Sequence, residues 1–431
     1  MAKQNMDENT GGAESLSVRK PDSGKRPQLW TRGFTMSFLA LSLISLCNYM
    51  FYSTIPMYAK LLVDNATLIG YTTGVYSLFS LAAHLVSGSL SDRYGYRTFS
   101  LAGLLLCAIG CGGYLISGSM PVLLLFRAVH GCGFGMFTTS CTAGSIGYIP
   151  RSQRAKGISY LSLYSTLSQA LGPYLALSIV SDGSKRGQFA ALFATSVGVV
   201  ACAAVLYWFA VRNSSSSRSE TDPVHAPSSG HTTLHAAEFL LCILPALIML
   251  VLCLAQSSVI SYLALYAEET GVVGIGLFFT VASVFIFIGR AAVSRIGEKV
   301  NTYFLLLPAC ATAALSLLGL ALASSRIPMI ALAVPYGFSF GMAGPLVNLM
   351  LINNLPDHLH GTATSFFHAS LDIGIGLGSI VMGLIGGRFG YRQAIFAGSF
   401  IASAAFLIVL IHLMLTMRKN PQHAHPSTPQ I

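Results

Sequence analysis

The segment that decides the fold is Gly88-Ser-Leu-Ser-Asp-Arg-Tyr-Gly-Tyr-Arg97, a polar stretch that follows one apolar run and precedes the next. Its spacing of basic residues and glycine returns in the second half of the chain, where Arg295, Gly297 and Lys299 repeat Arg93, Gly95 and Arg97. A longer repeat, offset by 206 positions and without a gap, places Gly131, Phe134, Gly135, Met136, Pro150, Gly172 and Arg186 on Gly337, Phe340, Gly341, Met342, Pro356, Gly378 and Arg392. The chain is therefore predicted to be two duplicated halves in parallel orientation, an arrangement in which two bundles can rock about a shared centre.

The composition places the chain in a membrane. Of its 431 residues, 53% are hydrophobic and 9% are charged, and the mean hydropathy is +0.65, which excludes a water-soluble globular domain. Twelve apolar runs are bounded by polar residues, glycine or proline: 33–58, 69–91, 99–117, 121–145, 157–180, 189–211, 237–267, 271–289, 302–323, 327–352, 361–386 and 394–417. Each run is long enough to supply the ~20 residues that a helix needs to cross a ~30 Å hydrocarbon core. We predict an all-α membrane protein of twelve transmembrane helices in two pseudo-symmetric six-helix bundles.

The polar segments predict the domain organisation. Residues 1–31 form a polar N-terminal tail with no apolar core before a cleavage site, so we expect no cleaved signal peptide. The first bundle spans 32–211 and the second spans 237–417, followed by a polar C-terminal tail at 418–431. Between the bundles, residues 212–236 contain a serine run and two prolines and cannot bury apolar surface, which predicts a flexible linker.

The formal charge of +10 does not indicate a nucleic-acid partner, because the basic residues lie at the ends of apolar runs. Six of the 25 lysines and arginines fall on the side opposite the termini: Lys60, Lys185, Arg186, Arg326, Arg388 and Arg392. Arg127 lies within a span, and the remaining eighteen, Arg290 among them, fall on the side of the termini. The positive-inside rule then predicts that both termini are cytoplasmic.

The nine cysteines all lie inside apolar runs and show no Cys-x-x-Cys spacing, which is typical of small packing residues. The sequence shows no nucleophile–base pair and no spacing of metal ligands. We therefore predict that the protein is not an enzyme and needs no metal and no cofactor.

Three motifs carry a resemblance to a known family. The opening segment is similar to the signature loop Gly-x-x-x-Asp-Arg-x-Gly-x-[Arg/Lys] of the major facilitator superfamily. The segment Arg127-Ala-Val-His-Gly-Cys-Gly133 resembles a fourth-span motif of its proton-driven branches, and Gly172-Pro173 resembles the fifth-span motif of its efflux antiporters. The flanking glycines of that last motif are replaced by Ser165, Ser168 and Ala176. Residues 127–173 resemble a bacterial group that contains multidrug-type exporters and exporters of staphylopine-type metallophores.

The resemblance implies alternating access and assigns conformational gating to the motif residues Gly88, Asp92, Arg93, Gly95, Arg97, Gly172 and Pro173. In the resembling family the aspartate position holds the cytoplasmic end of the eleventh helix, and a negative charge at a helix N-terminus is favourable by ~0.3–1 kcal/mol. The equivalent of Asp92 in the second half is the uncharged Ser294. The resemblance therefore implies an electrostatic latch in one half only.

Polar side chains recur on the spans that are expected to face inward: Asn48, Tyr52, Tyr164, Gln169, Gln256, Tyr262 and Asn348. Each of them alone is equally well explained by an ordinary interhelical hydrogen bond. As a set, they predict a solvated substrate cavity.

Four ionisable residues within spans form the predicted proton-coupling site: Asp372, Arg127, His368 and His84. From the helical rise, Asp372 lies roughly 17 Å from the cytoplasmic end of its helix and Arg127 roughly 10 Å from the outer end of its own, so their depths are similar. His368 and Asp372 share one helical face at i, i+4. A buried charge needs a partner or a cavity. The alternative is that Arg127 and Asp372 serve only as packed polar side chains.

Together these features predict a secondary active transporter that exports a small amphipathic molecule, either a drug-like compound or a secreted metallophore, and is coupled to protons. Proton-coupled uptake of a sugar or organic acid is one alternative, because the fifth-span motif is incomplete. A non-transporting receptor with the same fold is another. The expected partners are a small-molecule substrate, protons and the lipid bilayer, without nucleic acid, and the protein is expected to be a monomer in the bacterial cytoplasmic membrane.

Overall fold

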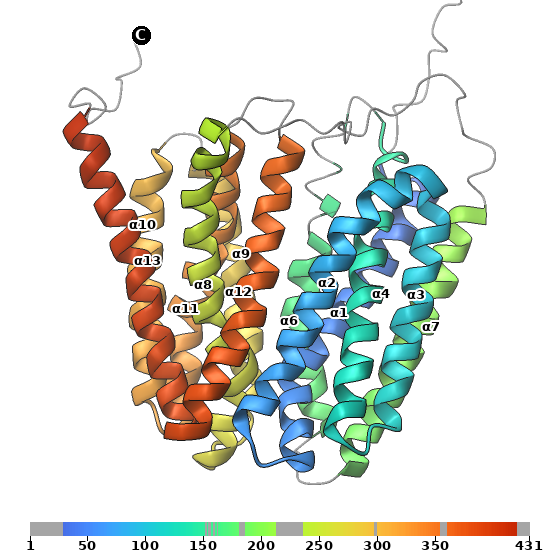
Figure 1. The fold of residues 1–431 in the computed structure, drawn as a ribbon, viewed down its shortest axis with the longest axis horizontal. Coiled ribbons are helices and arrows are strands. Elements are labelled where there is room, and N and C mark those ends of the chain that lie inside the picture. Colours follow the sequence, from blue (N-terminus) through green and yellow to red (C-terminus); the bar gives the residue numbers. More distant parts are fainter. Residues whose placement is uncertain are drawn as a thin grey trace, which may run out of the picture.

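The computed structural model describes residues 29–150, 153, 157, 160, 161, 163–180, 186–212, 236–296, 300–353 and 360–419. This part of the chain forms twelve helices of 18 residues or more: α1 (Arg32–Leu62), α2 (Ala66–Tyr94), α3 (Tyr96–Leu115), α4 (Met120–Ile146), α6 (Leu163–Val180), α7 (Arg186–Arg212), α8 (Ala236–Glu269), α9 (Gly276–Ile296), α10 (Thr302–Leu322), α11 (Arg326–Asn353), α12 (His360–Phe389) and α13 (Tyr391–Lys419). Figure 1 shows them as two groups side by side, α1 to α7 and α8 to α13. The predicted linker and most of both predicted tails lie outside the described residues.

Ten of these helices are long and apolar enough to cross a bilayer. The hydrocarbon core offers no partner for a free N–H or C=O, and a helix satisfies all of these groups within one segment. The other two helices are α2, which is more polar, and α6, in which the described apolar stretch is Leu167–Val180. Both pack against the other group, α2 on α12 and α6 on α9. Because α2 faces the other bundle, it meets less lipid than an outer helix and tolerates more polar side chains.

Most helices extend beyond the predicted apolar runs, and two of these extensions place Asp92 and Arg290 within a helix. Because α2 continues to Tyr94, Asp92 lies in its last turn, and Gly95 joins α2 to α3 at φ 92°, which is a backbone conformation that favours glycine. The placement of Arg290 in a loop was wrong, because α9 runs to Ile296 and contains this residue. An apolar run marks only the part of a helix that lies in the hydrocarbon core. The helix itself continues past the end of that run into polar surroundings.

The duplication predicted from the sequence is visible in the packing of the two halves. A Cβ added at Gly131 of α4 would collide with the backbone oxygen of Tyr76 in α2. Its repeat equivalent, Gly337 of α11, meets the backbone oxygen of Ala282 in α9 in the same way. Tyr76 and Ala282 are themselves 206 positions apart. Glycine therefore brings the same pair of helices into backbone contact in both bundles.

The two bundles meet tightly on one side. Because twelve helices alternate in direction, α1 begins on the side where α13 ends; we call this the terminal side and the opposite one the distal side. On the distal side, a Cβ at Gly74 of α2 would lie 3.3 Å from the backbone oxygen of Gly376 in α12, and one at Gly383 of α12 would lie 2.6 Å from that of Ala66. On the terminal side, a Cβ at Gly88 of α2 would meet no atom within 4 Å. The interface is closed distally and separates toward the terminal side, as Figure 1 also shows.

Candidate functional site

A cavity lies between the two bundles and encloses about 400 Å³ of empty space, part of which is open to solvent. Its wall is formed by residues of α1, α6, α8, α9 and α11: Tyr49, Tyr52, Ser53, Gln169, Pro173, Gln256, Ile260, Phe279, Ala282, Ser283, Ile286 and Tyr336. Aromatic and aliphatic surface surrounds a few amide and hydroxyl groups, which is the composition of a site for a small amphipathic molecule.

The structure places three of the predicted cavity residues, Tyr52, Gln169 and Gln256, at this wall. Tyr262 lies elsewhere: it is fully buried on the distal side, where its hydroxyl donates to the backbone oxygen of Ser379 at 2.7 Å. Its assignment to the substrate cavity is therefore corrected, because it joins α8 to α12 where the bundles close.

The remaining predicted cavity residues, Asn48, Tyr164 and Asn348, are not part of the wall. Asn48 of α1 and Asn348 of α11 each hold a buried amide oxygen that has no hydrogen-bond partner in the described part of the chain. Tyr164 of α6 packs against the apolar core of the first bundle. The wall also contains Tyr49 and Tyr336, which the sequence analysis did not assign, although their phenol groups give the same polar signal as that of Tyr52.

Gly172 and Pro173 of the fifth-span motif position one wall of the cavity. A Cβ at Gly172 in α6 would lie 2.7 Å from the Cβ of Tyr49 in α1. The ring of Tyr49 in turn lies 5.6 Å from that of Tyr52, centroid to centroid. The missing side chain at Gly172 thus lets α6 approach α1 closely enough to set the direction of this aromatic pair.

Three of the four predicted coupling residues come together at the interface of α2 and α12. The Nε2 of His84 lies 3.9 Å from the Oδ2 of Asp372, and both side chains are about one-fifth exposed, at 23% and 21%. The Nδ1 of His84 lies 2.7 Å from the hydroxyl of Thr139, which orients the ring. The ring of His368 stacks on that of His84 at 6.3 Å between centroids. A carboxylate and two imidazoles therefore share one partly solvated position between the bundles.

The fourth predicted residue, Arg127, is not part of this group. Its Nε donates to the backbone oxygen of Thr72 at 2.8 Å, and its guanidinium lies 4.3 Å from the ring centroid of Tyr76. Among the described residues it forms no ion pair with Asp372 in this conformation. Similar depth along the two helices does not bring these charges together, because Arg127 turns toward α2 of its own bundle.

Arg290 is the charged residue that the sequence analysis did not assign to the site. It lies half-buried in α9 and interacts electrostatically with the phenol of Tyr49, as does Asp372. Neither charged residue lines the cavity, but both influence Tyr49, which does. A helix prediction that continued past the apolar run at 271–289 would have placed Arg290 within this helix.

The signature segment lies at the terminal end of α2. Arg93 is exposed and stacks over Tyr94 at 5.4 Å, and Arg97 stacks over Trp208 of α7 at the same distance. The side chain of Asp92 lies outside the described part of the structure. The predicted gating role of this segment stays a prediction.

The sequence profile of the Major Facilitator Superfamily matches residues 37–379. The chain belongs to the Major Facilitator Superfamily. Its members are transporters, which confirms the predicted fold class and the prediction that the protein is not an enzyme. The bundles, the glycine contacts and the central cavity are thus those of a multi-pass membrane transporter that takes a small molecule between its halves.

Two relatives of this transporter cover nearly the whole chain. The staphylopine export protein of Staphylococcus aureus is 23% identical over 398 residues, which is 89% of this chain and 96% of that one. The multidrug resistance protein MdtG of Yersinia enterocolitica is 23% identical over 378 residues, which is 84% and 88% of the two chains. A solved structure of a POT family transporter in complex with a thioalcohol-conjugated peptide shares the fold, with a TM-score of 0.74 over 90% of this chain and 97% of that chain at 14% identity.

Proposed function

We propose that this transporter exports a small amphipathic molecule across the bacterial cytoplasmic membrane by alternating access, in exchange for protons. The observation that carries the proposal is the cavity between the bundles, closed on the distal side, with the His84–Asp372 pair bridging α2 and α12 beside it. The names of the two relatives, a metallophore exporter and a multidrug resistance protein, support the export direction. The terminal side is then cytoplasmic, as the basic residues predict, and the protein acts as a monomer.

The chemistry of coupling follows from the position of the pair. A proton on Asp372 removes its negative charge, and a proton on His84 adds a positive one, so either event changes the attraction between α2 and α12. These helices must separate on the distal side and approach on the terminal side when the cavity changes its opening. Proton exchange at Asp372, with His368 as a second titrating neighbour, thereby selects the conformation.

The distal closure consists of contacts that can break without leaving buried charge. Between the bundles, the hydroxyl of Tyr262 in α8 donates to the backbone oxygen of Ala66 in α2 at 3.4 Å, and the hydroxyls of Thr73 in α2 and Ser261 in α8 lie 3.4 Å apart. At the rim, Lys60 of α1 pairs with Glu268 of α8 at 3.0 Å, and both side chains are partly exposed. Neutral hydrogen bonds contribute ~0.5–1.5 kcal/mol each and exposed ion pairs less, which suits a gate that opens repeatedly.

The test is transport by inside-out vesicles from cells with and without the gene, with a panel of drug-like compounds and metal-chelating metabolites supplied outside the vesicles. An exporter accumulates its substrate in these vesicles when an inward-acid gradient is imposed, and the accumulation collapses when a protonophore is added. Asp372→Asn is expected to abolish it. Asp64→Asn, which neutralises an exposed carboxylate in the α1–α2 turn, is the matched control. Substrate movement in the opposite direction would establish uptake, and no movement of any compound would contradict the transport proposal.

A further inference from the structure

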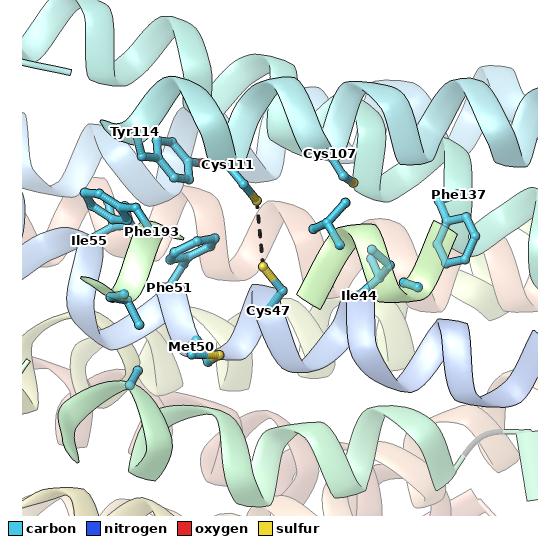
Figure 2. Packing of buried hydrophobic residues seen from close by; sticks show 14 of the residues in the cluster. Ile44, Cys47, Met50, Phe51, Ile55, Cys107, Cys111, Tyr114, Phe137 and Phe193 are labelled. Atoms are coloured by element: carbon cyan, nitrogen blue, oxygen red, sulfur yellow. Dashed lines mark hydrogen bonds between the residues drawn. The ribbon is translucent and has the colours of Figure 1, made fainter. Parts of the chain in front are cut away.

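Two cysteines from different helices meet in the core of the first bundle. Cys47 of α1 and Cys111 of α3 are 64 residues apart in the chain, yet their Sγ atoms lie 3.7 Å from each other. Both are fully buried and neither is in a disulfide. Figure 2 shows the two sulfurs pointing at one another between Phe51, Tyr114 and Ile44. Neither residue lines the substrate cavity.

His130 of α4 completes a group of three. One ligand atom each from Cys47, Cys111 and His130 lies within 4.8 Å of the other two. Thiolate sulfurs bind a metal at about 2.3 Å, so two of them in a trigonal or tetrahedral site are about 3.7–4.0 Å apart. The measured 3.7 Å separation of the sulfurs is within that range. Three helices therefore present soft ligands at metal-binding spacing.

One ring nitrogen of His130 has a hydrogen-bond partner in the described part of the chain and the other has none. The Nδ1 of His130 lies 3.0 Å from the hydroxyl of Tyr114. The Nε2 is buried and has no hydrogen-bond partner in the described part of the chain. Histidine ligands characteristically have one ring nitrogen fixed by an outer hydrogen bond while the other binds the metal. An imidazole nitrogen left without any partner in a dry core is otherwise costly.

A buried positive charge lies next to this group. Arg127, one turn before His130 on α4, is 1% exposed and interacts electrostatically with Cys111 and His130. Among the described residues no carboxylate lies within ion-pair distance of it, and its Nη1 has no hydrogen-bond partner. A buried guanidinium needs a compensating negative charge.

We propose that Cys47, Cys111 and His130 bind one Cu(I) ion. Two thiolates and one monovalent cation leave a net charge of −1, which compensates Arg127. A divalent zinc ion would leave no net charge and would require a fourth ligand. On binding, the two S–H bonds are replaced by two Cu–S bonds, both protons pass to water, and His130 donates a lone pair, with no change in the oxidation state of copper. The bound ion would cross-link α1, α3 and α4 into a rigid unit within the first bundle, away from the cavity wall.

The first test uses the purified, reduced full-length protein in detergent, with Cu(I) supplied in a large excess of glutathione so that single thiols do not retain it. After desalting, mass spectrometry for metals is expected to find about one copper per chain. Cys47→Ala and Cys111→Ala are expected to lower this at least tenfold. Cys310→Ala removes a buried cysteine from α10 in the other bundle and is expected to change nothing.

The second test needs no variant and so does not depend on whether the variants fold. X-ray absorption of the copper-loaded protein is expected to show two sulfur ligands and one imidazole nitrogen. Copper bound by sulfur alone would remove His130 from the site. Loss of copper from Cys310→Ala as large as from Cys47→Ala, no retention by the wild type, or a Cys47–Cys111 disulfide in the purified protein would each overturn the proposal.

Discussion

The replacement Asp372→Asn tests the proposed coupling mechanism most directly. With His84 protonated and Asp372 ionised, unit charges 3.9 Å apart attract by about 4 kcal/mol at an effective dielectric constant of about 20. Both side chains are partly exposed, and desolvation offsets part of this attraction, so we take about half, or about 2 kcal/mol. At 1.4 kcal/mol per factor of ten, the substitution shifts the equilibrium between the two openings of the cavity by about 30-fold.

The assay is proton flux on addition of substrate to proteoliposomes that contain a pH-sensitive dye. The wild type and Asp64→Asn are expected to move protons with substrate, and Asp372→Asn is expected to show only background flux. Asp372→Glu keeps a carboxylate at the same position and is expected to restore part of the flux. Substrate binding, followed by the shift of the thermal unfolding midpoint, is expected to survive in Asp372→Asn, because the cavity wall is formed by other residues.

Full coupled flux through Asp372→Asn would refute this reasoning. The coupling role would then pass to Glu268, which pairs with Lys60, or to its neighbour Glu269 at the end of α8. The His84–Asp372 pair would in that case be a structural contact between α2 and α12.

Three further predictions concern other parts of the chain. Asp92→Asn is expected to slow transport with little change in expression, whereas Ser294→Ala is expected to be nearly silent because no charge is lost; equal effects in a vesicle efflux assay would contradict a one-sided latch. Gly131→Ala is expected to destabilise the protein by about 1–3 kcal/mol, because the new methyl group meets the Tyr76 backbone, while Gly118→Ala, which meets nothing within 4 Å, is expected to leave the thermal unfolding midpoint unchanged. Replacement of 213–235 by a Gly/Ser segment of equal length is expected to preserve expression and transport, and loss of folded protein would show that the linker is structural.

The sequence by itself determined the class of fold and the duplication of its two halves. A bilayer forces the backbone into helices, so apolar runs report the spans directly. Close helix contact requires glycine, so the repeat of Gly131 and Gly135 at Gly337 and Gly341 marks the same contacts in both halves. Helical periodicity also placed His368 and Asp372 on one face, which the structure turns toward His84.

The tertiary structure alone decided which charged and soft side chains meet across helices. The rotation of α4 about its axis directs Arg127 toward Thr72 and Tyr76, and the sequence periodicity does not predict that rotation. Arg290 lies in α9, and not in a loop, because α9 continues beyond its apolar run. Cys47 and Cys111 carry no spacing signal, since they lie 64 residues apart and meet only where α1 packs against α3. Sequence periodicity specifies the faces within one helix, whereas contacts between helices depend on how whole surfaces pack together.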